Sequence, residues 1–211
     1  MKKDIINKLN KRIIEISIKH RLSHLGSCLT TLPIIYDIFE KMNPEDKFVL
    51  SNGHAGLAYY VVLEYFKGVN AEELLEKYGI HPERDLDNYI DVSTGSLGLG
   101  LTIATGIAFS NPSIKVYCII SDGECAEGSI WEALRVIDEF CLSNIEVHAN
   151  INGWSAYKAV DSNKLSIRLR AFLPEIKIHF TDAQNFLNWD TPLQSHYKMA
   201  TENMLTEIKK I

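Results

Sequence analysis

The stretch SDGECAEGSIWEAL, residues 121–134, indicates the fold class, because it lies where an apolar strand is followed by a helix. Residues 114–120 (IKVYCII) are mostly β-branched and apolar, as expected for a buried strand. Residues 127–141 have the apolar spacing of a helix. The acidic groups at this junction are therefore predicted at the carboxyl end of the strand, the edge of an open α/β sheet where ligands bind.

The rest of the chain continues this alternation of strands and helices. Strands are predicted at residues 47–50, 114–120, 144–149 and 175–180, and helices at 3–20, 30–42, 56–67, 71–77, 101–110, 127–141, 163–172 and near 201–210. Alternating elements indicate parallel βαβ units, so we predict a three-layer α/β/α fold with a mainly parallel sheet and helices on both faces. No Gly/Ser/Pro-rich linker interrupts the chain, and residues 1–211 are predicted to form a single domain.

Composition narrows the class of protein. The sequence is 46% hydrophobic and 23% charged, which is typical of a globular protein with an apolar core. The net charge of -5 argues against nucleic acid or an anionic membrane as the main partner. No apolar run reaches the roughly 18–20 residues that span a bilayer, and the charged start MKKDIINKLN lacks the apolar core of a signal peptide. The four cysteines form no CxxC pair, and Cys118 and Cys141 are interpreted as core residues, so we expect a cytoplasmic location.

Asp122 and Asn152 follow two successive predicted strands. The helix between those strands has about 14 residues, or roughly 21 Å, which suits one crossover back along a strand. The two side chains are therefore predicted to lie near each other at one sheet edge. Their oxygens suit Mg²⁺, and Gly123 at a helix start would let backbone N–H groups approach a phosphate. From spacing alone, the alternative that Asp122 caps the helix and that Asn152 and Gly153 form a turn stays open.

Five motifs in residues 23–154 resemble those of the transketolase family, whose members bind thiamine diphosphate. SDGECAEGSIWEA resembles the family stretch GDG-x-x-x-EG-x-x-WEA, and SDG with Asn152 resembles the fingerprint GDG…N. STGSLGLG (residues 93–100) resembles STGSLGQG, SHLGSCLT (23–30) resembles SGHPGGSLS, LSNGHAG (50–56) resembles LSKGHAA, and IHPE (80–83) resembles GHPE.

The resemblance implies a role for each matching residue. Asp122, the Asn152 side chain and the Trp154 carbonyl would ligate Mg²⁺, with Ca²⁺ or Mn²⁺ as substitutes. The other cofactor-binding positions would be His54, Ser96, Leu97, Gly98, Gly123, Glu127 and His196, with Gly98 and Gly123 facing the diphosphate. The catalytic set would be His24, His54, His81, Glu127 and Glu132, in which the histidines bind the sugar and move protons.

The acidic residues of the opening stretch are predicted to have different roles. Glu127 and Glu132 match glutamates at the dimer interface of the family. Being five residues apart, they are expected about 140° apart on one helix, with Glu127 toward the cofactor and Glu132 toward a partner. Glu124 is interpreted as a plain surface carboxylate.

The sequence also departs from the family pattern. Ser121 and Asn150 replace a usual glycine and a usual acid, and the segment after Ala171 is interpreted as shortened by roughly 30 residues relative to the family. Two interpretations of His196 are therefore open: it contacts the cofactor, or it is a surface histidine. No cluster of arginine and lysine residues is predicted to bind a substrate phosphate.

The resemblance covers only the diphosphate-binding domain of a transketolase. The pyrimidine-binding domain, which supplies an essential glutamate, is expected in a second chain, so the protein is predicted to be the N-terminal subunit of a split transketolase. With the C-terminal subunit as partner, it would form an α2β2 heterotetramer. The complex would transfer a two-carbon ketol unit from a ketose or its phosphate to an aldehyde. Two alternatives are a deoxyxylulose-phosphate-synthase-like, acyloin-forming enzyme and a non-catalytic cofactor-binding or regulatory subunit.

Overall fold

The structure is a computed structural model that describes residues 2–155, 158–189 and 194–208, without the side chain of His196. The chain forms two compact units, each built from separate stretches of sequence. Unit 1 comprises Met1–Glu40, His54–Ile80 and Asp182–Ile211, and unit 2 comprises Lys41–Gly53 and His81–Thr181. Each unit has its own architecture, and the single domain over residues 1–211 stays a prediction.

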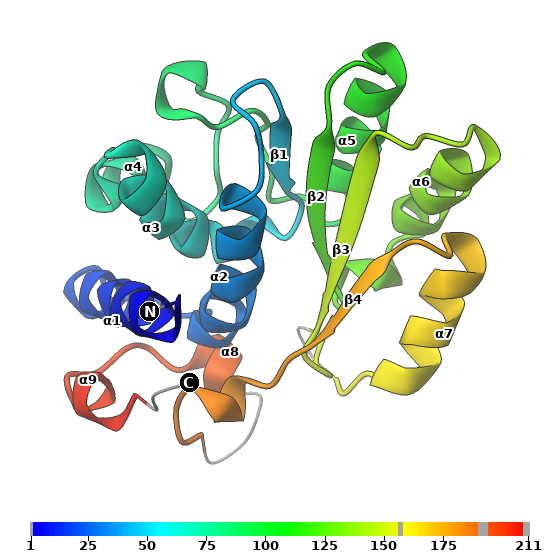
Figure 1. Ribbon diagram of the computed structural model, residues 1–211. Helices are drawn as coiled ribbons and strands as arrows, with labels where there is room; N and C mark the ends of the chain where they lie inside the picture. The colour runs from blue at the N-terminus through cyan, green and yellow to red at the C-terminus, as the bar shows by residue number, and fades with distance from the viewer. Residues whose placement is uncertain (1, 156–157, 190–193, 209–211) are drawn as a thin grey trace. The chain divides into compact units, whose positions relative to one another are not determined.

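Unit 2 is built around a parallel sheet of four strands in the order β1-β2-β3-β4 (Figure 1). The strands are β1 (Lys47–Leu50), β2 (Val116–Ser121), β3 (Ile145–Ile151) and β4 (Lys177–Phe180). All six residues of β2 are buried, which explains its continuous β-branched and apolar sequence. In the register of β2 and β3, Ser121 lies opposite Asn150, so the loops that follow these strands leave the same edge of the sheet.

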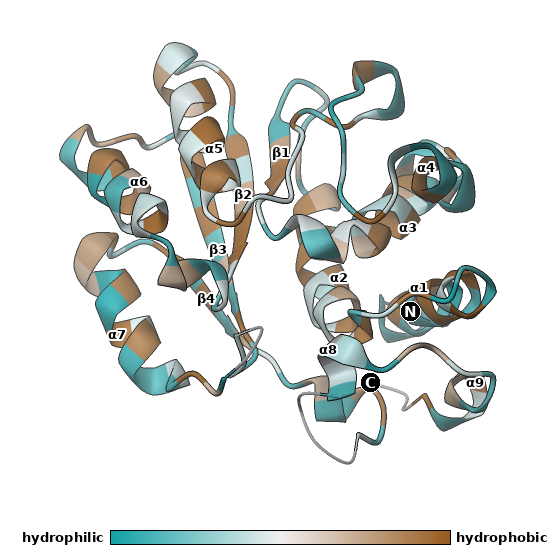
Figure 2. Ribbon diagram, turned by 180° about the vertical axis from the view of Figure 1, so that it is seen from behind, coloured by the Kyte–Doolittle hydropathy of each residue, from teal (hydrophilic) through white to brown (hydrophobic). Residues whose placement is uncertain are grey.

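Three helices of unit 2 pack on the sheet through one continuous apolar core. They are α5 (Leu99–Ser110), α6 (Gly128–Glu139) and α7 (Ser162–Phe172). Their buried side chains, among them Leu101, Leu134 and Leu169, join the core with Cys118 and Ile120 of β2. Figure 2 shows α5 as mostly hydrophobic, whereas α6 and α7 carry hydrophilic stretches as well.

Unit 1 is helical. It contains α1 (Lys2–Lys19), α2 (Leu25–Phe39), α3 (Gly56–Lys67), α4 (Ala71–Tyr78), α8 (Gln194–Tyr197) and α9 (Asn203–Glu207). α2 contacts α1, α3 and α8, and its side chains Leu29, Leu32 and Ile35 are fully buried. Arg12 of α1 makes two hydrogen bonds, of 3.0 and 3.1 Å, to the carboxylate of Glu64 on α3. Among the described residues, no helix is both long and apolar enough to cross a membrane.

The predicted elements are present, with corrections at their ends. The helix predicted at 56–67 has those bounds as α3. The helix predicted at 30–42 begins earlier, at Leu25, because Leu25, Cys28, Leu29 and Leu32 already follow the helical apolar spacing and are buried. The strand predicted at 144–149 continues to Ile151 as β3, and the short helix α8 was not predicted.

Candidate functional site

Asp122 connects the loops that follow β2 and β3. Its Oδ2 accepts hydrogen bonds from the backbone N–H groups of Asn152, Gly153 and Trp154, at 3.0, 2.7 and 3.1 Å. Its Oδ1 accepts the N–H of Gly123 at 3.0 Å. The helical crossover thus brings Asp122 and Asn152 together as predicted. Their roles as ligands stay a prediction.

The environment of Asp122 suits a hard cation. Asp122 is 3% exposed, and burial raises the pKa of its carboxyl to about 6, although the four backbone N–H groups oppose this shift. Among the described residues, no cationic side chain bonds to it. The Oδ1 of Asn152 accepts the Trp154 N–H at 3.0 Å, so this amide oxygen lies in the same turn. Carboxylate, amide and carbonyl oxygens are the ligands that Mg²⁺ prefers, and these residues therefore fit the predicted metal.

Ser96, Leu97 and Gly98 form a turn at the start of α5. Ser96 is exposed, Leu97 is 39% exposed, and Gly98 is buried with a positive φ of 81°. A Cβ at Gly98 would lie 2.3 Å from Ser129 Oγ and 2.9 Å from the Cβ of Glu127. This close approach and the positive φ both require glycine, and they place Glu127 directly against the turn.

The structure corrects the prediction for Glu124. This residue is not a surface carboxylate, since it is 0% exposed. Its Oε1 accepts the Ser51 hydroxyl at 2.6 Å and the Gly98 N–H at 3.1 Å, and its Oε2 accepts the Ser121 N–H at 3.1 Å. Burial raises the pKa of its carboxyl, and the hydrogen bonds counteract that shift. Spacing on a helix could not reveal this role, because the bonded groups come from three separate segments.

The predicted helical geometry of Glu127 and Glu132 is also wrong. Glu127 precedes α6 with extended backbone angles, φ −86° and ψ 135°, and the helix begins at Gly128. The 140° separation therefore does not apply, because only Glu132 is helical. Both glutamates are exposed, as an interface would require, but their contact with a partner stays a prediction.

The predicted histidines belong to both units. His24 and His54 lie in unit 1 with their ring centroids 5.8 Å apart, and His24 has left-handed backbone angles just before α2. His81 lies in unit 2, where a Cβ on Gly95 would approach its Cγ to 2.9 Å. The pairing of His24 with His54 is thus a feature of unit 1, and a channel lined by all three histidines stays a prediction. The His196 side chain lies outside the described residues, although its backbone belongs to α8.

A pocket beside Asp122 contains cations that sequence reasoning missed. Its volume is about 260 Å³, and its lining includes Asp122, Trp131, Lys158, Lys164 and Arg168. These cations group only because α7 begins beside the loop after β3. Lys158, Lys164 and Arg168 thus form a basic group at this pocket. The expectation that no such cluster binds a substrate phosphate stays a prediction.

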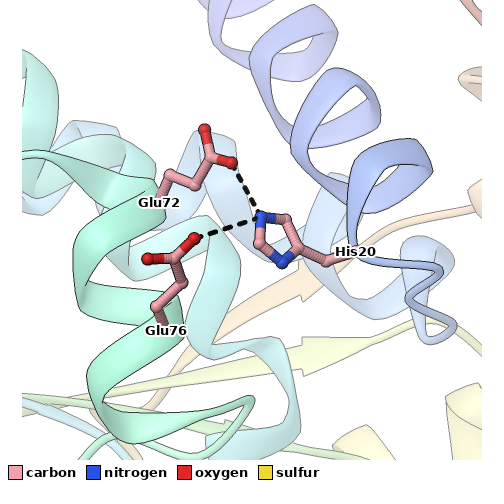
Figure 3. A group of neighbouring side chains, drawn as sticks. All are labelled: His20, Glu72 and Glu76. Carbon is pink, nitrogen blue, oxygen red and sulfur yellow. Dashed lines mark hydrogen bonds and ion pairs between the residues drawn. The ribbon is translucent and has the colours of Figure 1, made fainter.

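A second cluster of polar side chains lies in unit 1 (Figure 3). The Nε2 of His20 lies 2.8 Å from Glu72 Oε1 and 4.0 Å from Glu76 Oε1. The three residues have the composition of a metal site. However, Lys19 also pairs with Glu72, and hydrogen bonds from Lys19 and then His20 lower the pKa of Glu72 to about 2. The cluster is explained as an ion-pair network that joins the end of α1 to α4.

The structure also corrects one cysteine. Cys118 is buried in the core, as predicted, but Cys141 is exposed in the turn after α6. The apolar spacing of the helix extended to residue 141, whereas α6 ends at Glu139.

Comparison with known proteins identifies the family. Residues 2–162 match the family model described as "Transketolase, thiamine diphosphate binding domain". The chain belongs to the transketolase family. Human transketolase is 34% identical over 172 residues, covering 71% of this chain but 27% of that protein. One subunit of the apulose-4-phosphate transketolase of Phocaeicola vulgatus is 35% identical over 159 residues, covering 65% of this chain and 56% of that relative.

Solved structures share the fold. A transketolase from Leishmania mexicana has a TM-score of 0.68 at 20% identity, covering 80% of this chain and 31% of its own. A transketolase from Pichia stipitis has a TM-score of 0.69 at 22% identity, covering 81% and 30% of the two chains. The α/β class with a parallel sheet and helical layers is thereby confirmed. This transketolase-family chain spans about a quarter to a half of the length of the curated relatives that it matches.

Proposed function

We propose that this chain binds thiamine diphosphate and Mg²⁺ and acts as the N-terminal subunit of a split transketolase. The observation that carries the proposal is the contact of Asp122 with the Asn152–Trp154 turn. This contact gathers one carboxylate, one amide oxygen and backbone groups at the carboxyl edge of the sheet, where phosphate ligands bind in open α/β folds. The match to a thiamine-diphosphate-binding domain also supports the proposed binding of this cofactor.

The residues of this edge have distinct parts in the proposal. Asp122, Asn152 and the carbonyl of Trp154 would hold the metal ion. The backbone of Gly123 and Gly98 would face the diphosphate, and Leu97 would pack against an aromatic ring of the cofactor. Thiamine diphosphate, when bound, supplies the stabilisation of a carbanion that ketol transfer requires.

The side chains that would handle the sugar come from the resemblance to the family. His24, His54 and His81 would bind hydroxyl groups and move protons, because a neutral imidazole both donates and accepts near pH 7. Glu127 lies against the Gly98 turn and is exposed, which suits a carboxylate shared with a second chain. Glu132 would contact that chain from α6.

The proposed partner is a C-terminal chain with a pyrimidine-binding domain. The relative from Phocaeicola vulgatus is named as one subunit of a transketolase, which supports a division of the enzyme between two chains. Two copies of each chain, an α2β2 heterotetramer, would provide two active sites. The complex would transfer a two-carbon ketol unit from a ketose, free or phosphorylated, to an aldehyde.

The proposal is tested by calorimetric titration of thiamine diphosphate and Mg²⁺ into the chain, alone and with the candidate partner. Micromolar binding that tightens with the partner and disappears in Asp122→Ala supports it. Equal heats for the wild type and Asp122→Ala in both conditions would overturn it. Glu64→Gln is the control, because Glu64 bonds to Arg12 and to the Ala71 N–H within unit 1.

A further inference from the structure

Glu124 differs in burial from Glu127 and Glu132, the other glutamates of its segment. It follows Asp122 and Gly123 in a short 3-10 turn, η3 (Glu124–Ala126), before α6. Glu127 and Glu132 are exposed, whereas Glu124 is 0% exposed. A carboxylate placed so deeply must be compensated by specific hydrogen bonds, because burial of an unpaired charge is very costly.

The compensating bonds come from three segments that are far apart in the sequence. Ser51 follows β1, Gly98 precedes α5, and Ser121 ends β2. The Oε1 of Glu124 accepts from the first two at 2.6 and 3.1 Å, and its Oε2 accepts from the third at 3.1 Å. Hydrogen bonds to a charged acceptor are about twice as strong as neutral ones, so this carboxylate holds the three segments together firmly.

The Gly98 turn is confined on its other sides as well. Ser129 Oγ donates to the Gly98 carbonyl at 3.2 Å. Two residues on, a Cβ at Gly100 would lie 2.5 Å from the Cα of Ser51. The bond from the Gly98 N–H to Glu124 therefore fixes the turn against the end of β1, and with it the position of Leu97.

The second carboxylate oxygen of Glu124, Oε2, bonds to the segment that carries Asp122. Ser121, whose N–H it accepts, directly precedes Asp122. One buried carboxylate thus connects the turn that would face the diphosphate to the segment that would hold the metal. No other described side chain bonds to both Gly98 and Ser121.

We propose that Glu124 is a positioning residue, which sets the separation between the Gly98 turn and the Asp122 segment and so shapes the cofactor site without touching the cofactor. This inference rests on the proposed function. At metal sites, residues that orient the ligating side chains through hydrogen bonds change metal affinity or activity by about 10–100-fold when they are altered. We expect an effect of that size on the affinity for thiamine diphosphate.

The test compares Glu124→Gln with wild type by calorimetric titration of thiamine diphosphate at saturating Mg²⁺. A glutamine can keep the bonds to Ser51 and Gly98, but it presents an NH₂ group where Ser121 needs an acceptor. Binding is expected to weaken about tenfold or more. The control Glu64→Gln loses a carboxylate paired with Arg12 and is expected to lower the melting temperature while leaving the affinity unchanged.

A second measurement separates positioning from general stability. Hydrogen exchange of the Gly98 amide is expected to accelerate in Glu124→Ala and to stay at the wild-type rate in Glu64→Gln. If the Glu124 variants do not fold, Ser51→Ala serves instead, because it removes one donor to Oε1, and weaker binding is again expected. Wild-type affinity in folded Glu124→Gln, or in Ser51→Ala where that variant serves, would overturn the inference while the proposed function stands. Absence of binding by wild type would overturn both.

Discussion

The carboxylate of Asp122 accepts the backbone N–H of Gly153 at 2.7 Å, and thereby joins the loops after β2 and β3. The bond belongs to a set of three from consecutive N–H groups, which together orient the Asn152–Trp154 turn around one oxygen. Asp122 therefore supports the local structure in addition to its proposed part in metal binding. The two roles can be separated by substitution.

Asp122→Ala is expected to lower the free energy of unfolding by about 2–4 kcal/mol, because several N–H groups lose their acceptor. Asp122→Asn keeps one oxygen for the turn, and we expect a loss of about 1 kcal/mol. Urea unfolding measures both values. Both variants are expected to lose the binding of Mn²⁺, used as a probe for Mg²⁺. Equal stability of the two variants would contradict the role of the three bonds.

Gly98→Ala is expected to destabilise the protein by about 2–4 kcal/mol, through both a strained φ and a clash. Gly68 is the matched control, because its φ of 74° is similar but no atom lies within 4 Å of an added Cβ. Gly68→Ala carries the strain alone, about 1 kcal/mol. Denaturant midpoints of the two variants measure the difference. Similar midpoints would show that Ser129 and Glu127 move away from the added Cβ with little loss of stability.

His148 is expected to make stability fall on acidification. Burial lowers the pKa of His148 to about 4, against about 6.5 in an unfolded chain. Between pH 6.5 and 4 the His148 ring is therefore protonated in the unfolded state but neutral in the folded state. The free energy of unfolding consequently decreases as the pH falls toward 4. The groups that face this ring are Glu146, bonded at 2.8 Å, and His179, at 2.9 Å, with Lys41 and Lys115 bonded to Glu146.

The size of this effect is measured by urea unfolding at pH 7.5 and 5. His148 is expected to contribute a loss of about 2 kcal/mol over that interval. Glu146 affects stability at lower pH. Burial raises the pKa of its carboxyl, but hydrogen bonds from Lys41, His148 and Lys115 outweigh burial and bring the pKa to about 2. Its contribution is therefore complete above pH 4.5 and is lost as the pH falls through 2. His148→Gln should remove only the upper loss, and an unchanged profile would refute the assignment.

Cys141 is expected to react with a thiol reagent in the native protein, because it is exposed, whereas Cys28 and Cys118 are buried. Burial also raises the pKa of the Cys28 thiol to about 12, which suppresses the reactive thiolate. Labelling followed by peptide mass spectrometry should locate the fast reaction at Cys141. Cys141→Ser is the control. Rapid labelling of Cys28 or Cys118 in this variant would contradict their burial.

Much of the fold was accessible from local patterns. The strand predicted at 114–120 from its β-branched residues is present as β2 at 116–121, and the helix at 56–67 was recognisable from its apolar spacing. The adjacency of Asp122 and Asn152 followed from the length of the crossover between two parallel strands. Each of these inferences depends on residues that are neighbours in sequence or one crossover apart.

Other features depend on packing between distant segments. Glu124 looked like a surface residue because nothing in its neighbourhood shows that Ser51 and Gly98 approach it. Lys164 and Arg168 joined the pocket of Asp122 only through the position of α7. The exposure of Cys141 depended on where α6 ends.

The sequence by itself determined the order of the strands and helices, the family and the edge of the sheet that carries Asp122, because these follow from periodicity and from motifs of fixed spacing. Only the tertiary structure decided which carboxylate is buried and what it connects. The physical reason is that a buried charge is stable only where separate segments bring their donors to it, and that convergence exists only in the folded chain.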